Sequence, residues 1–299
     1  MANTSLSIGP AGWTRPDWNR TVYDKAARRG THPLDVLCRY SNLAEIDRTF
    51  HEPLKPEIAR LYAAKARRHD GFLFTALLGR CFTHDRVLDD ASVEAWRAGL
   101  LPLLRAGCLG ALIMQFPWAF RFNEENRQHL IRLRRAFHDF PLAAEMRHDS
   151  WLLDEAVTTL IDYHVAIVNV DQPEYFRAMP AGAHLTSGVA IVRLHGRANP
   201  AAFRDFDAPP DSTYLYNLHE LLEWKPRLAR LTANAARTLV IATNGAAGRS
   251  LVNALQLEEI LGRTPLEAPP ALLAAYPAEL AAFHAPRPVQ PNLLPAQAA

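Results

Sequence analysis

Cysteine is scarce in this chain of 299 residues and follows no disulfide or metal-binding pattern. The three cysteines, Cys38, Cys81 and Cys108, lie far apart, and no Cys-x-x-Cys pair occurs. An odd number of widely spaced cysteines excludes a disulfide framework and a cysteine-based zinc site, and it favours a reducing compartment.

Long hydrophobic runs are also absent. No segment reaches the roughly 18 uninterrupted apolar residues that a membrane-spanning helix needs. The N-terminal stretch MANTSLSIGPAGW has no basic region followed by an apolar one, so it does not resemble a signal peptide. We therefore expect no membrane association and a cytoplasmic location.

The sequence has little excess of charge of either sign. Its 33 lysines and arginines nearly balance 31 acidic residues, and hydrophobic residues make up 49% of the chain. This balance argues against a dedicated nucleic-acid coat, and the hydrophobic content predicts a sizeable core. The length fits either one barrel with a tail or two domains of average size.

Several common catalytic motifs are missing. The lysines, Lys25, Lys55, Lys65 and Lys225, all fall in predicted loops or helices, which leaves no candidate for Schiff-base chemistry. No Gly-x-Ser-x-Gly motif marks a serine nucleophile. The turn from Gly9 to Trp13 contains a proline and lacks the Gly-x-Gly-x-x-Gly spacing of dinucleotide-binding folds.

Strand-sized apolar runs recur through the chain, and helix-sized amphipathic segments separate most of them. The runs are Leu6–Gly9, Leu43–Ile46, Phe72–Leu78, Leu109–Phe116, Leu142–Met146, Val165–Val170, Val189–His195 and Thr238–Ala242. The pattern predicts an α/β fold, a single (β/α)8 TIM barrel over residues 1–263.

The predicted helices include 56–69, 123–138, 150–163, 212–231 and 250–261, the last three beginning with a plausible N-cap serine. Residues 264–299 are rich in alanine and proline, and they predict a terminal helix over 271–284 followed by an extended tail.

Polar residues collect where the predicted strands end, which is where TIM barrels place their active sites. Side chains alternate between the two faces of a strand. We therefore expect Glu145 and Arg147 of the fifth strand, Asp171 of the sixth, and Arg193 and His195 of the seventh to face inward. Further candidates at strand ends and in the following loops are Trp13, Glu45, His84, Gln115, His148, Trp151 and Asn244.

Each of these residues alone is adequately explained as a solvated strand end or a structural ion pair. Together they place several charges in one confined mouth, and desolvating them is costly unless they pair or bind a ligand. We expect Glu145, Asp171, Arg193 and His195 to line one cleft. We also expect Trp13 and Trp151 to flank that cleft rather than fill the core, although Trp151 also fits a buried position under the following helix.

The same residues carry a family resemblance over roughly residues 5–262. The runs concerned are IGPAGW, AEIDRTFHEP, FTHDR, MQFPWAFRFNEEN, AAEMRHDSW, VDQP, IVRLHGR and TNGAAGRSLVNALQL. In this order they resemble the YecE-like family, domain of unknown function 72. The resemblance implies a TIM barrel and no established activity. The positions that match the family are Glu45, Thr49, His84, Gln115, Glu145, Arg147, His148, Trp151, Asp171, Arg193, His195, Asn244 and Asn253.

This chain also departs from the pattern that the resemblance implies. Leu77 stands where the third strand usually carries a lysine, and Thr243 replaces the first of two paired asparagines. Pro10-Ala11 replaces Thr-Ser before the first Gly-Trp, and His51 replaces an aromatic residue. These departures point to altered specificity or to lost activity.

The favoured function is an enzyme that acts on a small anionic substrate, a phosphorylated compound or a sugar acid, by acid–base chemistry. Glu145 or Asp171 is the expected general base, with one pKa raised by their mutual repulsion, His195 the acid or orienting partner, and Glu45 a further carboxylate. Arg147 and Arg193 suit recognition of an anion. Gly248 and Arg249 lie just before a predicted helix. They fit a phosphate-binding turn and a plain loop equally well.

Two other functions stay open. A metal-dependent nucleic-acid phosphodiesterase would use Glu45, Glu145, Asp171 and His195 as ligands, but the arginines would repel a cation and Asn244 replaces a carboxylate on the last strand. A non-catalytic sensor or partner-binding barrel is the third possibility. We expect no resident cofactor, keep a divalent metal open, and identify no protein partner.

The substitution Glu145→Gln separates two roles of this carboxylate. A lost ion pair would destabilise the fold, whereas a base strained by neighbouring carboxylates would leave stability unchanged or raise it.

Overall fold

Eight parallel strands form one nearly closed barrel in the computed structural model, which describes residues 5–23, 31–201 and 212–286. The strands are β1 (Ser5–Pro10), β2 (Leu43–Ile46), β3 (Leu73–Leu77), β4 (Leu109–Gln115), β5 (Leu142–Glu145), β6 (Ala166–Asp171), β7 (Val189–Leu194) and β8 (Arg237–Ala242). Hydrogen-bonded neighbours run in the order β1-β8-β7-β6-β5-β4-β3-β2. The predicted TIM barrel is confirmed.

The barrel closes between β1 and β2 through side chains and a single backbone bridge rather than a full ladder. Ser41 Oγ donates to the Ile8 carbonyl at 2.8 Å, and Gly12 N donates to the Glu45 carbonyl at 2.9 Å. Gly9 allows this approach, because a Cβ at that position would lie 1.8 Å from the Leu43 carbonyl oxygen.

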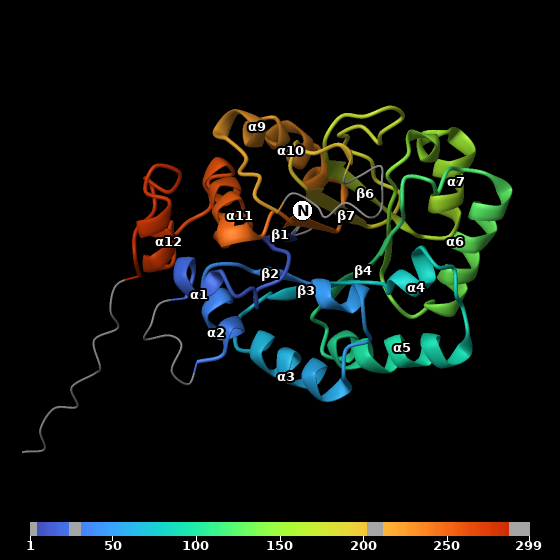
Figure 1. The fold of residues 1–299 in the computed structure, drawn as a ribbon, viewed down its shortest axis with the longest axis horizontal. Coiled ribbons are helices and arrows are strands. Elements are labelled where there is room, and N and C mark those ends of the chain that lie inside the picture. Colours follow the sequence, from blue (N-terminus) through green and yellow to red (C-terminus); the bar gives the residue numbers. More distant parts are fainter. Residues whose placement is uncertain (1–4, 24–30, 202–211, 287–299) are drawn as a thin grey trace, which may run out of the picture.

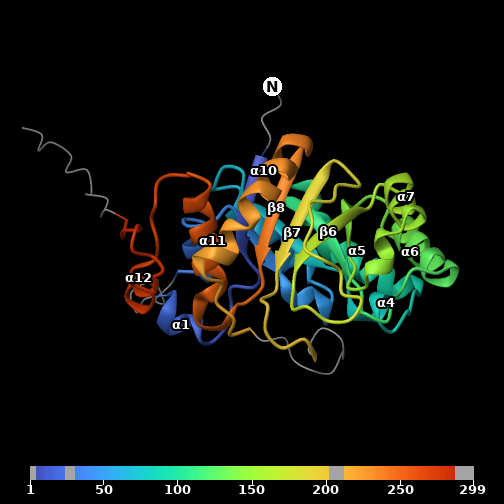
Figure 2. The ribbon, with the colours of Figure 1, turned by 90° about the horizontal axis from the view of Figure 1, so that it is seen from above.

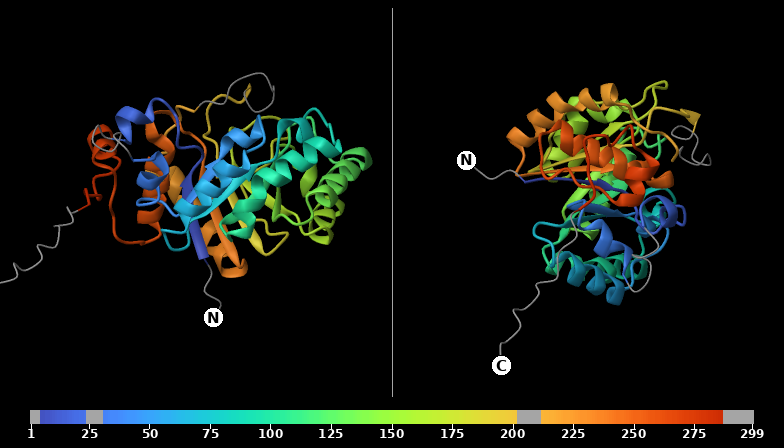
Figure 3. Two further views of the ribbon diagram at one scale, coloured as in Figure 1. Left: turned by 90° about the horizontal axis from the view of Figure 1, so that it is seen from below. Right: turned by 90° about the vertical axis from the view of Figure 1, so that its left-hand side faces the viewer.

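The helices surround the strands in most of the places that the sequence predicts. They are α1 (Trp18–Thr21), α2 (Pro33–Leu37), α3 (Pro56–Ala66), α4 (Arg80–Thr83), α5 (Asp90–Arg105), α6 (Glu124–Ala136), α7 (Asp154–Asp162), α9 (Leu218–Leu222), α10 (Trp224–Asn234), α11 (Arg249–Ile260) and α12 (Pro270–Ala275). Short 3-10 turns cover Asp47–Phe50, Asp149–Leu152 and Ala246–Gly248. Helices α3 and α5 cover one side of the barrel, and α10 and α11 cover the opposite side (Figures 1 and 3).

The connection from β6 to β7, residues 172–188, contains no helix. Figure 2 shows β6, β7 and β8 side by side. The outer face of β6 is held by polar contacts instead: Asn169 Nδ2 donates to the His184 carbonyl, and His184 N donates to Asn169 Oδ1 at 2.7 Å. Polar side chains of β6 therefore find partners outside the barrel.

Three helix predictions differ from the structure. The predicted helix over 150–163 begins with the 3-10 turn Asp149–Leu152, and α7 starts only at Asp154, so Ser150 is not its N-cap. The predicted helix over 212–231 is two helices, α9 and α10, and α9 begins only at Leu218 behind a capping box of Asn217 and Glu220. The predicted terminal helix over 271–284 is reduced to α12, because the chain turns back and pairs Glu267 with His284.

The predicted tail lies largely outside the described residues. None of the described helices is long and apolar enough to cross a bilayer.

Candidate functional site at the barrel mouth

Six of the predicted site residues meet inside the barrel at the carboxyl ends of β2, β4, β5 and β7. We call this set the mouth cluster: Glu45, Gln115, Glu145, Arg147, Arg193 and His195. All but Gln115 are buried. The inward parity expected for β5 and β7 is confirmed, because Ala190, Val192 and Leu194 of β7 pack outward in a cluster with Trp224 and Leu228.

Arg193 is the centre of the mouth cluster. Its Nη1 donates to Gln115 Oε1 at 2.8 Å and to Glu145 Oε2, and its Nη2 donates to Glu45 Oε1 at 2.6 Å. A guanidinium held by two buried carboxylates is compensated for its desolvation. These contacts raise the pKa of Arg193, so it stays charged.

Glu145 accepts from three donors. Oε1 accepts from Arg147 Nη2 at 2.8 Å and from His195 Nε2 at 3.1 Å, and Oε2 accepts from Arg193. Burial alone would raise the pKa of Glu145, but the interactions with Arg193, His195 and Arg147 outweigh it and hold that pKa well below its usual value. The expected rise of a carboxylate pKa by coupling to Asp171 is therefore wrong for Glu145, which is a poor general base.

His195 lies between Glu145 and Thr243. Its Nδ1 is 2.9 Å from Thr243 Oγ1, and its Nε2 must carry a proton because the Glu145 carboxylate only accepts. Burial lowers the pKa of His195 to about 4, with Arg193 and Arg147 adding to the effect and Glu145 opposing it. The neutral imidazole accepts from the Thr243 hydroxyl, and a second proton would turn that hydroxyl toward the Leu194 carbonyl, 3.0 Å away.

Glu45 has a different environment from Glu145. Burial raises its pKa, although Arg193 lowers it in part. Its Oε2 and the Nε of Arg193 are buried and have no hydrogen-bond partner among the described residues. With both glutamates ionised and His195 neutral the two arginines are balanced, so each proton taken up by Glu45 or His195 leaves the cluster one positive charge in excess.

The rim of the mouth on the β3–β5 side carries further basic groups. Burial, together with the charges of Arg80 and Arg147, lowers the pKa of His84 to about 3. Burial also lowers the pKa of His148, with contributions from Arg121 and Arg177. His148 contacts Trp118 at 5.3 Å between ring centroids and accepts from Ser150 N at 3.1 Å, so it also caps the turn that follows β5.

Asp171 does not belong to the mouth cluster, and its predicted inward orientation is wrong. Oδ1 accepts from Arg197 Nε at 2.9 Å and from the Tyr216 hydroxyl at 2.9 Å, and Oδ2 accepts from Trp224 Nε1 at 2.7 Å. Tyr216 and Trp224 pack on the outer side of β7 and β8. The outward orientation lets Asp171 bind Trp224, at the start of α10, and Tyr216, which cover this part of the outer face.

Trp13 and Trp151 do not flank a cleft. Both are part of the hydrophobic core, and Trp151 is 0% exposed. Its indole stacks on Phe120 and donates Nε1 to the Phe120 carbonyl at 2.7 Å. Trp13 packs edge-on against Tyr62, with ring centroids 5.2 Å apart. The polar handle of Trp151 is therefore used inside the protein rather than toward a ligand.

The predicted phosphate-binding turn after β8 is occupied by the protein itself. Asp17 Oδ2 accepts from Ala247 N at 2.6 Å, and Trp18 Nε1 donates to the Gly245 carbonyl. A Cβ at Gly248 would approach Val22 and Leu272 to within 3 Å, so α1 and α12 cover this turn.

The two other predicted residues of this region also lie away from the cluster. Arg249 lies near Tyr276 rather than at the mouth, and its charge partly offsets the rise in the pKa of Tyr276 caused by burial. The Tyr276 hydroxyl donates to the Ala247 carbonyl. Asn244 is buried and donates to the Tyr214 carbonyl and to Asn253, which ties β8 to α11.

Three functional neighbours were not predicted as site residues. Thr243 continues the inward parity of Leu239 and Ile241, and this signal was available in the sequence. Arg197 follows His195 by two residues and binds Asp171 through two nitrogens. Tyr175 donates its hydroxyl to the Arg147 carbonyl at 3.3 Å, and no sequence pattern links these two positions.

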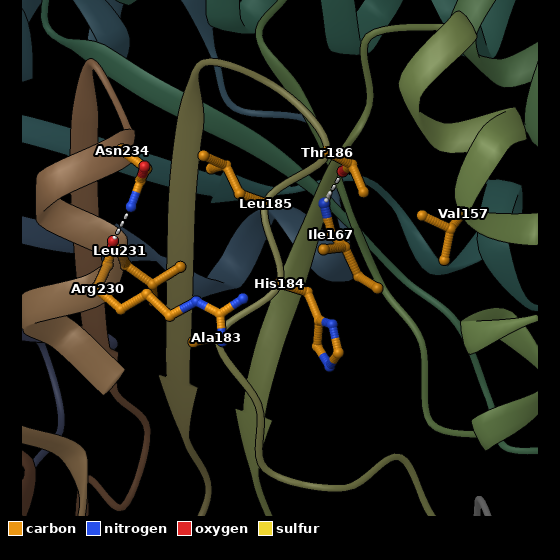
Figure 4. Close-up of a pocket in the computed structure, with 9 residues that line it drawn as sticks. All are labelled: Val157, Ile167, Ala183, His184, Leu185, Thr186, Arg230, Leu231 and Asn234. Carbon is orange, nitrogen blue, oxygen red and sulfur yellow. Dashed lines mark hydrogen bonds between the residues drawn. The ribbon is translucent and has the colours of Figure 1, made fainter. Parts of the chain in front are cut away.

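A separate pocket with a volume of about 400 Å³ lies outside the barrel, between α7 and α10 (Figure 4). His184, Thr186, Arg230 and Asn234 supply its polar lining. None of the predicted site residues lies there.

The donor set of the mouth cluster does not fit a metal ion. Glu45 and Glu145 are engaged by Arg193, and within the described ranges no three His, Cys, Asp or Glu side chains gather as a metal site would require.

Comparisons with known proteins agree with the fold. The model of the family described as "Protein of unknown function DUF72" matches residues 7–275. The UPF0759 protein YunF of Bacillus subtilis (strain 168) is 27% identical over 183 residues. That match covers 56% of this chain and 63% of the relative, less than two thirds of its length.

Solved structures of DUF72 family proteins are also similar. One from Thermotoga maritima MSB8 is 25% identical, with a TM-score of 0.72 over 86% of this chain and 99% of the other. One from Enterococcus faecalis V583 is 21% identical, with a TM-score of 0.75 over 87% of this chain and 96% of the other. The second likeness concerns the fold alone.

Proposed function

Since the chain belongs to the DUF72 family, whose description assigns no function, we propose from the mouth cluster that it is an enzyme acting on a small anionic substrate. His195 is the group that exchanges a proton with the substrate. The observation that carries the proposal is the buried contact of His195 Nε2 with Glu145 Oε1 at 3.1 Å, beside two arginines.

His195 suits proton transfer because the Thr243 hydroxyl has the Leu194 carbonyl as an alternative partner, so Nδ1 can exchange its proton with a substrate group while Nε2 stays bonded to Glu145. Glu145 stabilises the imidazolium, and the Thr243 hydroxyl donates to the neutral ring or accepts from the charged one. Glu145 acts as a positioning residue in this scheme, because Arg147 and Arg193 keep it ionised. Asp171, which faces outward, takes no part.

An anion suits this mouth because the basic groups lie near its opening. Arg147 borders both Glu145 and His84, and Arg121 lies 4.7 Å from the Trp118 ring on the same side. The two glutamates are deeper and are neutralised by Arg193. Anion binding would favour the protonated forms of Glu45 and His195, so it should be coupled to proton uptake and tighten as the pH falls.

Proton transfer can be followed directly without first identifying the substrate. The purified protein is incubated in D2O with mixtures of small phosphorylated and carboxylated compounds, and proton NMR records new signals and lost carbon-bound protons. We expect His195→Gln to slow any conversion at least ~100-fold, the lower end of what general acid–base catalysis contributes. His219→Gln, on the exposed face of α9, is the matched control.

Conversion that persists in His195→Gln at the wild-type rate would contradict the proposal. A second function is favoured by one observation: the pKa of Glu145 is held well below its usual value, which makes this carboxylate a poor base. If anions bind through Arg147 and no compound is converted, the protein is better described as a non-catalytic ligand-binding barrel.

A further inference from the structure

An apolar groove lies on the outer face of β6, far from the chemistry of the mouth cluster. In a TIM barrel each strand is followed by a helix that covers the outside of the sheet, but the β6–β7 connection contains no helix. The pocket of about 400 Å³ between α7 and α10 lies at this place (Figure 4). We call this pocket and the adjoining flank of α7 the outer groove. Its main apolar residues are Leu153, Val157, Ile161, Ile167, Leu185 and Leu231.

Three of these side chains form an apolar stripe along α7. Leu153 directly precedes the helix, and Val157 and Ile161 follow at intervals of four residues, so all three lie on one flank. Val157 lines the pocket, which identifies this flank as the one toward α10. The opposite flank meets α6, where Thr159 Oγ1 accepts from Arg127. Leu153 is 55% exposed and Ile161 is 47% exposed, so the stripe is largely open to a partner.

Exposed apolar side chains are concentrated around β6 and β7. Within the described part of the chain seven large apolar side chains are exposed, and five of them lie on the segments that flank these two strands. The five are Leu153, Ile161, Phe176, Leu218 and Leu222, and the other two are Leu61 and Val87. Such a concentration on one side of a molecule is typical of a protein–protein contact.

The two walls of the outer groove carry opposite charges. Every charged residue of α7 is acidic, and every charged residue of α10 is basic. The Arg230 side chain extends from α10 toward His184 (Figure 4), and its charge adds to burial in lowering the pKa of His184. Neither Arg230 nor Asp154 of α7 forms an ion pair with another described residue. Both signs of charge are thus available to a partner.

We propose that a second copy of this chain covers the outer groove, in a two-fold symmetric dimer whose axis runs along the groove. Rotation by 180° about this axis sets α7 of one copy against α10 of the other. Acidic residues then meet basic ones twice, as an isologous interface requires, and each α7 stripe packs where the partner lacks a helix after β6. An axis across the groove would instead set α7 against α7 and oppose like charges.

Sedimentation velocity of the whole chain over a range of concentrations tests the proposal. We expect a species with twice the chain mass of 33.4 kDa that dissociates on dilution. Ile161→Asp should raise the dissociation constant of the dimer at least ~100-fold, because symmetry brings two carboxylates into an apolar contact. Arg230→Glu should raise it about tenfold, because two attractive contacts become repulsive. If Ile161→Asp fails to fold, Arg230→Glu decides alone.

The matched controls are Leu61→Asp and Arg60→Glu on α3. This helix follows β2, which lies opposite β6 in the ring of eight strands, and Leu61 is 41% exposed, close to the value for Ile161. Both controls should dimerise as the wild type does. A wild type that stays monomeric would overturn the proposal and leave the groove to a different protein. A dimer that persists in Ile161→Asp and Arg230→Glu, or that the α3 changes weaken equally, would also overturn it.

Discussion

Glu145 and Asp171 end two neighbouring strands, β5 and β6, and both are almost completely buried, yet they belong to different parts of the protein. Glu145 points into the barrel and meets Arg147, Arg193 and His195. Asp171 points outward and meets Tyr216, Trp224 and Arg197. A carboxylate at the same end of the barrel therefore meets two different sets of partners, because the two strands present it on opposite faces.

The partners of these two carboxylates also differ in their access to water. The Arg193 side chain is 4% exposed, whereas Arg197 is 29% exposed and is shared with Glu223 at the surface. A charge that is enclosed from all sides depends fully on its partners, while a charge near water recovers part of its solvation. We therefore expect larger effects from changes around Glu145 than around Asp171.

Glu145→Gln should cause the largest loss of stability, about 3–5 kcal/mol at pH 7 in urea unfolding. The amide keeps one acceptor oxygen but turns an NH2 group toward a guanidinium, and Arg193 is left with Glu45 as its one carboxylate partner. This result would assign Glu145 to positioning rather than to the role of a strained base. An unchanged or raised stability would contradict the geometry of the cluster and restore the base.

His195 should make the stability of the protein depend on pH. Its pKa is about 4 in the folded state against 6.5 for the free side chain, so the unfolded chain takes up the proton first. The stabilisation is complete above pH 6.5 and is lost as the pH falls toward 4, by about 3 kcal/mol. Unfolding of wild type and His195→Gln at pH 7 and pH 4.5 measures it.

The difference between the two pH values should be smaller in His195→Gln than in wild type, and His219→Gln should behave as wild type. Equal pH dependence in all three proteins would mean that His195 is not held neutral by burial.

Much of the fold could be predicted from the sequence because the apolar runs are strand-sized and separated by helical segments. The inward orientation of the polar residues of β5 and β7 was also predictable, because apolar residues occupy the other face of each strand. These are Leu142 and Met146 for β5, and Ala190, Val192 and Leu194 for β7. The sixth strand gave no such guidance. Ile167 shares a face with Asn169 and Asp171, so the polarity of its residues favours neither orientation.

Other errors arose where the protein satisfies its own polar groups. The turn around Gly248 has the composition of an anion site, but Asp17, 230 residues away from Ala247 in sequence, already accepts from it. Trp151 follows a strand end as expected of a cleft residue, yet Phe120 from the preceding loop stacks on it and accepts its Nε1 hydrogen. Neither partner is identifiable from local sequence, because both contacts depend on the closed barrel.

Asp171→Asn should have the smallest of these effects, a loss of about 2 kcal/mol. Either Tyr216 or Trp224 can still donate to the one remaining amide oxygen, and Arg197 keeps Glu223 and access to water. The NH2 group that replaces Oδ1 or Oδ2 then faces a donor, which is the main cost. Urea unfolding beside Glu145→Gln under the same conditions gives the comparison directly.

The outward orientation of Asp171 also predicts that Asp171→Asn leaves the pH dependence contributed by His195 intact. A loss as large as that of Glu145→Gln, or a pH profile matching that of His195→Gln, would place Asp171 in the mouth cluster after all.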